Sequence, residues 1–393
     1  MKRPRRFLGV PPNIFYLGLV SFFGDISSEM TLTILPLFLS SVLGVGPAII
    51  GLIEGIAEST ATTLRVLSGW LADRTKKRKG LAVAGYALSS LVKPLLYFAN
   101  TWGLVLGVRF TDRLGKAVRT APRDALVASS TTPSERGRAF GFQRALDSYG
   151  AVVGLALAAL VVFLTERSAP ELTRGSYQKL VLIAIVPALL APLLIWWKVK
   201  EPPSAPAAGK PVFRQPLGGR FKLFLAVMVV FALGRFSDAF LILRANDLGL
   251  SPFYILIVLA MFNLVYAGIS LPAGVLSDRL GRKAVLLVGF AVYGLIYLGF
   301  ARAAAAWEVV LLFVAYGLYY GATEGVSRAY VADLVPEGGR GTAYGLYHGV
   351  VGLAALPASI LAGVLWQAIS PAAPFYLGAS LAGVAMAGLF FLK

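Results

Sequence analysis

About twelve long apolar stretches constrain the fold of this 393-residue chain more than any other feature. A helix needs about 20 mainly apolar residues to cross a bilayer, and each stretch provides that length. Several stretches are longer, which permits tilted helices. We therefore predict an all-α membrane protein with about twelve transmembrane helices. The predicted spans are residues 13–42, 48–72, 81–100, 103–128, 139–165, 177–198, 220–245, 253–277, 284–303, 307–333, 342–368 and 371–392.

The two halves of the chain carry the same sequence pattern. Residues 69–74 read Gly-Trp-Leu-Ala-Asp-Arg, and residues 274–279, 205 positions later, read Gly-Val-Leu-Ser-Asp-Arg. The same offset relates Arg123 to Arg328. This repetition indicates an internal duplication into two pseudo-symmetric six-helix bundles, an arrangement that in transporters places the substrate near the interface of the repeats. The predicted parts are a first bundle at 1–198, a cytoplasmic linker at 199–219 and a second bundle at 220–393.

Composition excludes several classes of function. The chain is 57% hydrophobic and 14% charged, against about 25% charged residues in a soluble domain. It has no cysteine and a single histidine, His348, which excludes thiolate and multi-histidine metal centres. The sequence contains no phosphate-binding loop of the G-x-x-x-x-G-K-[ST] type and no recognisable catalytic triad. We predict no metal, no cofactor and no enzymatic activity.

The net charge of +18 is explained by orientation in a membrane. Cytoplasmic loops of membrane proteins concentrate Lys and Arg, and basic clusters follow the second and eighth predicted spans. The loops at 43–47, 246–252 and 369–370 contain neither residue, whereas one outer loop carries Arg167 and Arg174. We therefore predict a multi-pass protein of the plasma (inner) membrane with both termini cytoplasmic, an uncleaved first span and no nucleic-acid partner.

Charged residues lie inside several predicted spans. A charge near the bilayer centre costs about 2.5–3.5 kcal/mol, so these groups must be paired, hydrated or both. At helical spacing the acidic residues of the first two spans and the basic residues of the fourth form stripes, which we expect to face a partly wet cavity. The acidic residues are Asp25, Glu29, Glu54 and Glu58. The basic stripe contains Arg109, Arg113, Lys116 and Arg123, and Arg119 lies in the same span.

These charges suggest a coupling mechanism. We hypothesise that Asp25, Glu29 or Glu58 accepts a proton in competition with Arg109 and Arg113. A buried carboxylate beside a guanidinium stays ionised, and removal of that partner favours protonation. The alternative is a static network of ion pairs that only holds the helices together.

The second half carries fewer charges inside its spans. The 205-residue offset pairs Arg119 with Glu324, so the halves do not carry equivalent charge and the first half is the predicted seat of ion coupling. Lone polar residues in spans also serve as helix-packing hydrogen bonders, which is the alternative to lining a cavity. The complete set of predicted substrate-cavity residues is Glu54, Lys116, Arg119, Asp147, Arg235, Asp238, Asn263, Tyr266, Glu324, Arg328 and His348.

Both copies of the repeated motif resemble the motif that follows the second helix in the major facilitator superfamily. The second copy is the fuller match. In the first copy, a glycine of the family motif is replaced by Lys76 or lies at a shifted position. The resemblance spans essentially the whole chain and implies that these residues latch the halves on the cytoplasmic side, while the alternative is a basic turn that fixes topology. The latch residues so implied are Gly69, Asp73, Arg74, Gly274, Asp278 and Arg279.

Two further motifs partly resemble those of the family. Arg109 resembles the arginine of proton-coupled members, although Arg113 stands where a glycine is expected. Gly150 and Gly154 resemble part of the antiporter motif, but Leu155 replaces its proline. Independently of the family, this glycine pair forms a small-xxx-small packing face.

The sequence therefore predicts a monomeric secondary transporter that works by alternating access between two bundles, in contact with membrane lipid. We favour proton-coupled efflux of a small solute, with H⁺ as the coupling ion. The alternatives are an importer or exchanger of an organic anion or metal ion, and a facilitated uniporter. A channel and a non-transporting receptor are further alternatives, which saturable counterflow would distinguish from a carrier.

Overall fold

The computed structural model describes residues 6–75, 77–132, 135–166, 171–202, 218–335 and 340–392. Side chains at 65–75, 271, 274–279, 324–325, 328, 332 and 340–342 are not among those described. Over the described residues the fold is helical, apart from an isolated antiparallel β-bridge between Phe7 and Val10.

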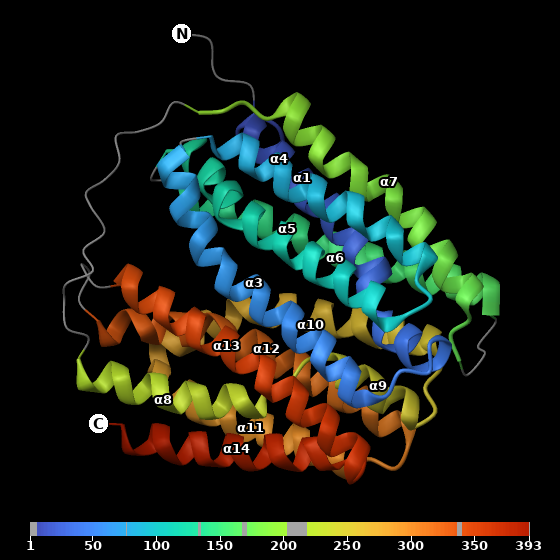
Figure 1. Ribbon diagram of the computed structural model, residues 1–393. Coiled ribbons are helices and arrows are strands. Elements are labelled where there is room, and N and C mark those ends of the chain that lie inside the picture. The colour runs from blue at the N-terminus through green and yellow to red at the C-terminus, as the bar shows by residue number, and fades with distance from the viewer. Residues whose placement is uncertain are drawn as a thin grey trace. The chain divides into compact units, whose positions relative to one another are not determined.

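The chain divides into two compact units (Figure 1). Unit 1 comprises Met1–Phe38, Thr60–Arg167 and Leu172–Lys210, and unit 2 comprises Leu39–Ser59, Ser168–Glu171 and Pro211–Lys393. Helix α3 therefore contributes its first turns to unit 2 and its later turns to unit 1. The elements up to residue 198 are α1 (Pro12–Leu32), α2 (Leu35–Leu37), η1 (Phe38–Val42), α3 (Pro47–Thr75), α4 (Arg78–Val92), η2 (Lys93–Phe98), α5 (Trp102–Ser129), α6 (Arg136–Glu166) and α7 (Arg174–Lys198).

The remaining helices belong to unit 2. They are α8 (Gly219–Gly234), α9 (Ala239–Asp247), α10 (Pro252–Leu280), α11 (Arg282–Arg302), α12 (Ala306–Leu334), α13 (Arg340–Ala368) and α14 (Ala373–Phe391). Within unit 2, α10 packs on α12, and α11 and α8 both pack on α14 (Figure 1).

The helices coincide with the predicted spans. Ten helical segments among the described residues are long and apolar enough to cross a membrane. The other two predicted spans, 48–72 and 103–128, correspond to α3 and α5, which have 29 and 28 residues. At 1.5 Å per residue α5 is about 42 Å long, which exceeds the hydrocarbon thickness of a bilayer. The charges along α5 set it apart from the apolar helices, and they form the candidate site.

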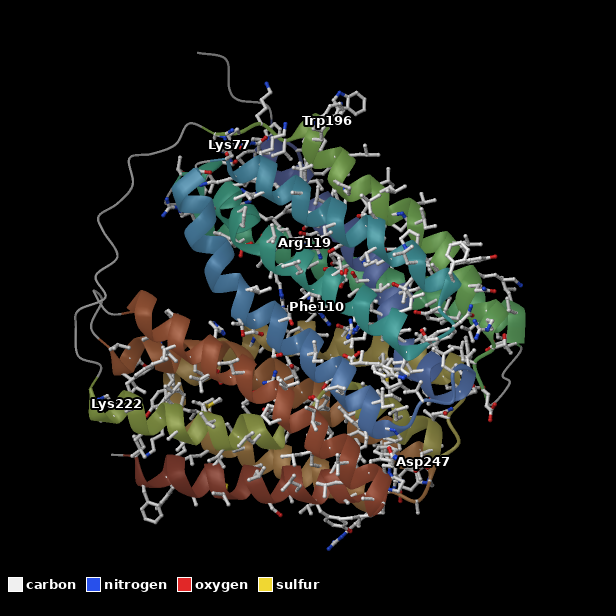
Figure 2. All side chains as sticks on the ribbon, viewed as in Figure 1. Lys77, Phe110, Arg119, Trp196, Lys222 and Asp247 are labelled. Atoms are coloured by element: carbon white, nitrogen blue, oxygen red, sulfur yellow. The ribbon has the colours of Figure 1, made fainter. Side chains whose placement is uncertain are left out.

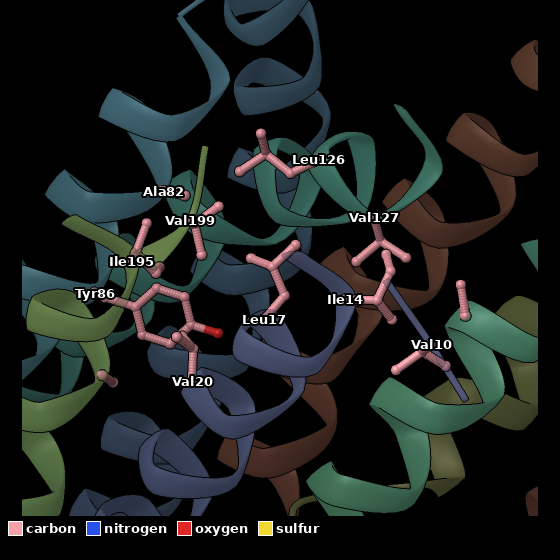
Figure 3. Close-up of a cluster of buried hydrophobic side chains, with 12 residues drawn as sticks. Val10, Ile14, Leu17, Val20, Ala82, Tyr86, Leu126, Val127, Ile195 and Val199 are labelled. Atoms are coloured by element: carbon pink, nitrogen blue, oxygen red, sulfur yellow. The ribbon is translucent and has the colours of Figure 1, made fainter. Parts of the chain in front are cut away.

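Helix α1 lies at the centre of unit 1, in contact with α6 and α7, while α4 packs on α5 and α7. The apolar side chains Ile14, Leu17 and Val20 of α1 are fully buried. Figure 3 shows them grouped with Tyr86 of α4 and Leu126 of α5. This core fixes α1 against its neighbours and so positions the charged residues farther along the same helix.

Glycines let α6 approach α1 closely. A Cβ atom at Gly150 would lie 2.5 Å from the carbonyl oxygen of Phe22, and one at Gly154 would lie 2.8 Å from that of Ile26. Both neighbouring atoms belong to the backbone, which cannot rotate away. The predicted small-xxx-small packing face of Gly150 and Gly154 is thereby confirmed.

We expect Gly150→Leu to destabilise unit 1 by at least about 1–3 kcal/mol, because the new side chain forces α1 and α6 apart. Gly141→Leu on the same helix is the matched control, since a Cβ there meets no described atom within 4 Å. Thermal unfolding of the purified protein in detergent measures both changes. Equal midpoints for the two variants would contradict the close packing.

Candidate functional site

Asp25 and Glu29 lie on α1 where this helix meets the basic side of α5. Both carboxylates are half-buried. Lys116 and Arg119 of α5 act electrostatically on Asp25, and Lys116 and Arg113 act on Glu29. Glu29 also accepts a hydrogen bond from the Thr33 hydroxyl one turn later. The acidic residues of α1 thus face basic residues of α5 within unit 1, whereas Glu54 and Glu58, the acidic residues of the second predicted span, belong to unit 2.

A buried ion pair of unit 1 joins Lys93 and Asp112. Lys93 begins the 3-10 helix η2, and its Nζ lies 3.9 Å from Oδ1 of Asp112 on α5, with both side chains about 5% exposed or less. The ammonium also donates to the hydroxyls of Ser28 at 2.8 Å and Ser27 at 3.4 Å on α1. The pair therefore connects three elements of unit 1, and Arg109, also buried, acts on the same carboxylate.

The basic stripe continues along α5 (Figure 2). The guanidinium of Arg119 is buried and lies over the Tyr86 ring at 4.0 Å, a cation–π contact. Arg123 donates to the Ser21 hydroxyl at 3.1 Å and pairs with the neighbouring Asp124 at 3.0 Å. With its amide oxygen turned toward Arg123, Gln143 accepts from the same guanidinium at 3.0–3.1 Å.

Asp147 of α6 is half-buried and lies within electrostatic reach of Asp25. Its Oδ1 atom is buried and has no hydrogen-bond partner among the described residues. Two carboxylates thus share one region with Lys116 and Arg119. Like-charged neighbours of this kind favour the binding of a proton by one of them.

In unit 2 the predicted span 220–245 is broken into α8 and α9, a feature that the sequence did not predict. Residues 235–238 leave the helix between Gly234 and Ala239. Side chains from other helices satisfy the freed backbone groups: Ser359 accepts from the Ser237 amide at 3.2 Å, and Tyr293 donates to the Gly234 carbonyl at 3.1 Å. A broken helix inside a span requires such compensation, and in transporters it marks a substrate site.

The break presents one cation and one carboxylate to a set of tyrosines on α12. Arg235 donates to the Tyr320 hydroxyl at 2.8 Å, and Tyr316 donates to Oδ1 of Asp238 at 2.8 Å. Phe262 of α10 stacks on the Tyr316 ring at 5.5 Å. Asp238 is exposed, and Arg235 is partly exposed. Unit 2 thus offers both charges beside aromatic rings.

Two carboxylates from the first turns of α3 join this region of unit 2. Glu54 is 6% exposed and accepts from the Ser237 hydroxyl at 3.4 Å. Glu58 is exposed, and both glutamates act electrostatically on Asp238. The break therefore has three nearby carboxylates and one arginine.

The remaining predicted residues of unit 2 have local roles. Asn263 donates to the Leu259 carbonyl of its own helix at 2.9 Å. The Tyr266 ring lies edge-on to Tyr320 at 5.8 Å and so borders the break. His348 lies beside the Tyr347 ring at 5.1 Å.

Several predicted residues lie outside the described side chains. Their helices are described, so Glu324 and Arg328 are placed on α12, and the repeated motifs fall at the ends of α3 and α10. Gly281 lies two residues after Arg279, at the position where the family motif has a glycine, and its φ of +88° is one that glycine adopts without strain. Lys76, its counterpart, is not described. The side chains concerned are those of Asp73, Arg74, Asp278, Arg279, Glu324 and Arg328, and the contacts of Gly69 and Gly274 are likewise outside the description.

Sequence reasoning missed the tyrosines around the helix break as site residues. Tyr316, Tyr319 and Tyr320 recur at helical spacing on α12, and Tyr293 and Tyr297 do so on α11. A hydroxyl repeated every three or four residues inside apolar spans was the available signal.

Multiple apolar spans, a broken helix and charge networks inside the spans together define a polytopic helical membrane transporter. Comparison with known proteins gives the family. The Major Facilitator Superfamily model matches residues 17–243 and again 223–393, so the chain belongs to this superfamily.

The similar proteins agree with this assignment. An uncharacterized MFS-type transporter of Methanocaldococcus jannaschii is 40% identical over 389 residues, covering 97% of this chain and 94% of that protein. The class E tetracycline resistance protein of Escherichia coli is 31% identical over 139 residues, which is 35% of this chain and 33% of that protein. A crystal structure of a point mutant of the nucleoside transporter NupG has a TM-score of 0.78 at 14% identity, covering 96% of this chain and 99% of that chain, and shows the same fold.

Proposed function

We propose that this protein is a proton-driven exporter of a small organic solute. The observation that carries the proposal is the position of Asp25 and Glu29, half-buried on a spanning helix and balanced by cations of α5. A charge inside a membrane costs about 2.5–3.5 kcal/mol and marks functional sites.

The coupling step follows from the balance of charge in unit 1. While Lys116, Arg113 and Arg119 stay close, their positive charges favour the ionised form of the α1 carboxylates and oppose the effect of burial. A conformational change that separates α1 from α5 removes this stabilisation and favours proton uptake. Alternating access then carries the proton across the membrane in exchange for solute.

The solute is proposed to contact the broken helix of unit 2. Arg235 and Asp238 supply opposite charges, and the rings of Tyr266 and Tyr320 supply flat apolar surfaces. Pockets that bind organic solutes combine apolar walls with a few polar groups in this way. The partial similarity to a tetracycline resistance protein supports efflux of an organic compound. We further propose a monomer in the inner membrane with both termini cytoplasmic.

A second candidate function is the import or exchange of an organic anion. The observation that favours it is the surplus of cations on α5. Five basic residues there outnumber the two acidic residues Asp112 and Asp124; the basic residues are Arg109, Arg113, Lys116, Arg119 and Arg123. Guanidinium groups recognise carboxylates and phosphates through paired hydrogen bonds.

Flux measurements in proteoliposomes decide between these functions. Vesicles that are acidic inside are expected to accumulate the solute of a proton-coupled exporter, because protons leave as solute enters. Vesicles that are acidic outside accumulate the solute of a proton-coupled importer. A panel of cationic, zwitterionic and anionic solutes is tested at both gradients, with a protonophore as control. Saturable flux that ignores the gradient and the protonophore would refute proton coupling, and non-saturable flux would indicate a channel.

A further inference from the structure

A cavity of about 670 Å³ opens at one end of unit 2, away from the broken helix. Its lining includes three cations, Arg220, Arg282 and Lys283, and one carboxylate, Asp333. The apolar part of the lining includes Leu287 and Phe390. The cavity thus combines a cationic part with an apolar part, and neither the coupling residues nor the solute contacts proposed above belong to it.

The cavity lies at the level where spanning helices begin and end. Gly219 starts α8, Arg282 starts α11, and Phe391 ends α14. Figure 2 shows Lys222, on the first turn of α8, at this end of the unit. Helix ends of this kind lie at the boundary between hydrocarbon and water, which is where phospholipid head groups are found.

Two of the three cations are held in place by the protein. Arg282 pairs with Asp333 and donates to the Ala329 carbonyl at 3.0 Å. Lys283 donates to the carbonyls of Phe390 at 3.0 Å and Leu392 at 2.6 Å, at the end of α14. These contacts fix the positive charges at the wall of the cavity.

Arg220 is the third cation, and it differs from the other two. It is exposed and makes no hydrogen bond or ion pair with the described residues. It lies near Tyr330 of α12, since Arg220 and Asp333 both act electrostatically on that ring. A guanidinium with all its donors available suits a phosphate group, which it can bind through two parallel hydrogen bonds.

We propose that this cavity binds the phosphate head group of an anionic phospholipid. Arg220 donates to the phosphate, and Arg282 and Lys283 supply the surrounding positive field. The acyl chains extend along the outside of the bundle over Leu280 and Phe390, which are 61% and 66% exposed. This apolar surface favours a lipid over free phosphate, and basic pockets between spanning helices are known to bind anionic head groups.

The test measures lipid binding to the purified full-length protein in neutral detergent. Dioleoylphosphatidylglycerol is titrated and the shift in thermal midpoint is recorded, with dioleoylphosphatidylcholine and inorganic phosphate as comparison ligands. We expect the anionic lipid to raise the midpoint more than either. Arg220→Ala is expected to weaken its binding roughly fivefold, since one interfacial cation contributes about that factor.

Lys222→Ala is the matched control, because Lys222 is also an exposed cation on the same turn of α8 but does not line the cavity. It should bind the anionic lipid like the wild type, and Arg220→Lys should retain part of the affinity. Equal stabilisation by phosphatidylcholine would overturn the proposal. So would equal stabilisation by inorganic phosphate, which would make this a free-anion site, or unchanged lipid affinity in Arg220→Ala.

Discussion

Transport driven by a pH gradient is expected to be lost when Asp25→Asn and Glu29→Gln are combined, while exchange of solute for solute continues. The amides have nearly the shape of the carboxylates but cannot bind and release a proton at neutral pH. In the wild type the two carboxylates face Lys116, Arg119 and Arg113. Without them the solute can still cycle between the two faces of the membrane, but no proton is moved in return.

The measurement compares two assays on the same proteoliposomes. Gradient-driven accumulation reports coupling, and counterflow of labelled against unlabelled solute reports binding and conformational exchange. Glu135→Gln is the control, since it removes a surface carboxylate of unit 1 whose side chain is 32% exposed and pairs with Arg6. Undiminished gradient-driven flux in the combined variant would refute the assignment to Asp25 and Glu29. Loss of counterflow together with accumulation would point to a structural role.

Much of the fold was predictable because apolar length decides the transmembrane helices. The predicted span 139–165 is α6, Arg136–Glu166, and the predicted span 307–333 is α12, Ala306–Leu334. Helical spacing also placed Asp25 and Glu29 on the side of α1 that faces α5. These features depend on local sequence, so they can be predicted from the lengths of the apolar stretches and the helical spacing of the charged residues.

The helix break in unit 2 was not predictable, because apolar residues flank it on both sides and no proline marks it. Contacts with distant residues stabilise it instead. Ser359 lies 122 positions from its partner Ser237, and Tyr293 lies 59 positions from Gly234. Such long-range compensation has no local sequence signature.

The buried pair of Lys93 and Asp112 leads to the second prediction with a large effect. Lys93→Met is expected to destabilise the protein by about 3–5 kcal/mol, because it removes the ion-pair partner of the buried Asp112 carboxylate and leaves only the weaker influence of the α5 arginines. Asp112→Asn should destabilise the protein by a similar amount, because it leaves the Lys93 ammonium buried without its carboxylate partner. Typical folding stability is only about 5–15 kcal/mol, so either variant removes a large share of it.

Combining Lys93→Met with Asp112→Leu should restore much of the lost stability, because an apolar pair of similar volume needs no compensation. The surface pair of Arg6 and Glu135 is the matched comparison, and Arg6→Ala should change the free energy of unfolding by at most about 1 kcal/mol. Chemical unfolding in detergent measures the change in the free energy of unfolding for these four variants. With Asp112→Leu added as the second single variant, it also gives the coupling energy of the buried pair. A double variant whose destabilisation equals the sum of its singles would show that the two charges do not depend on each other. Lys93 would then be held by the hydroxyls of Ser27 and Ser28 alone, and the charge balance of unit 1 would rest on the groups facing α1.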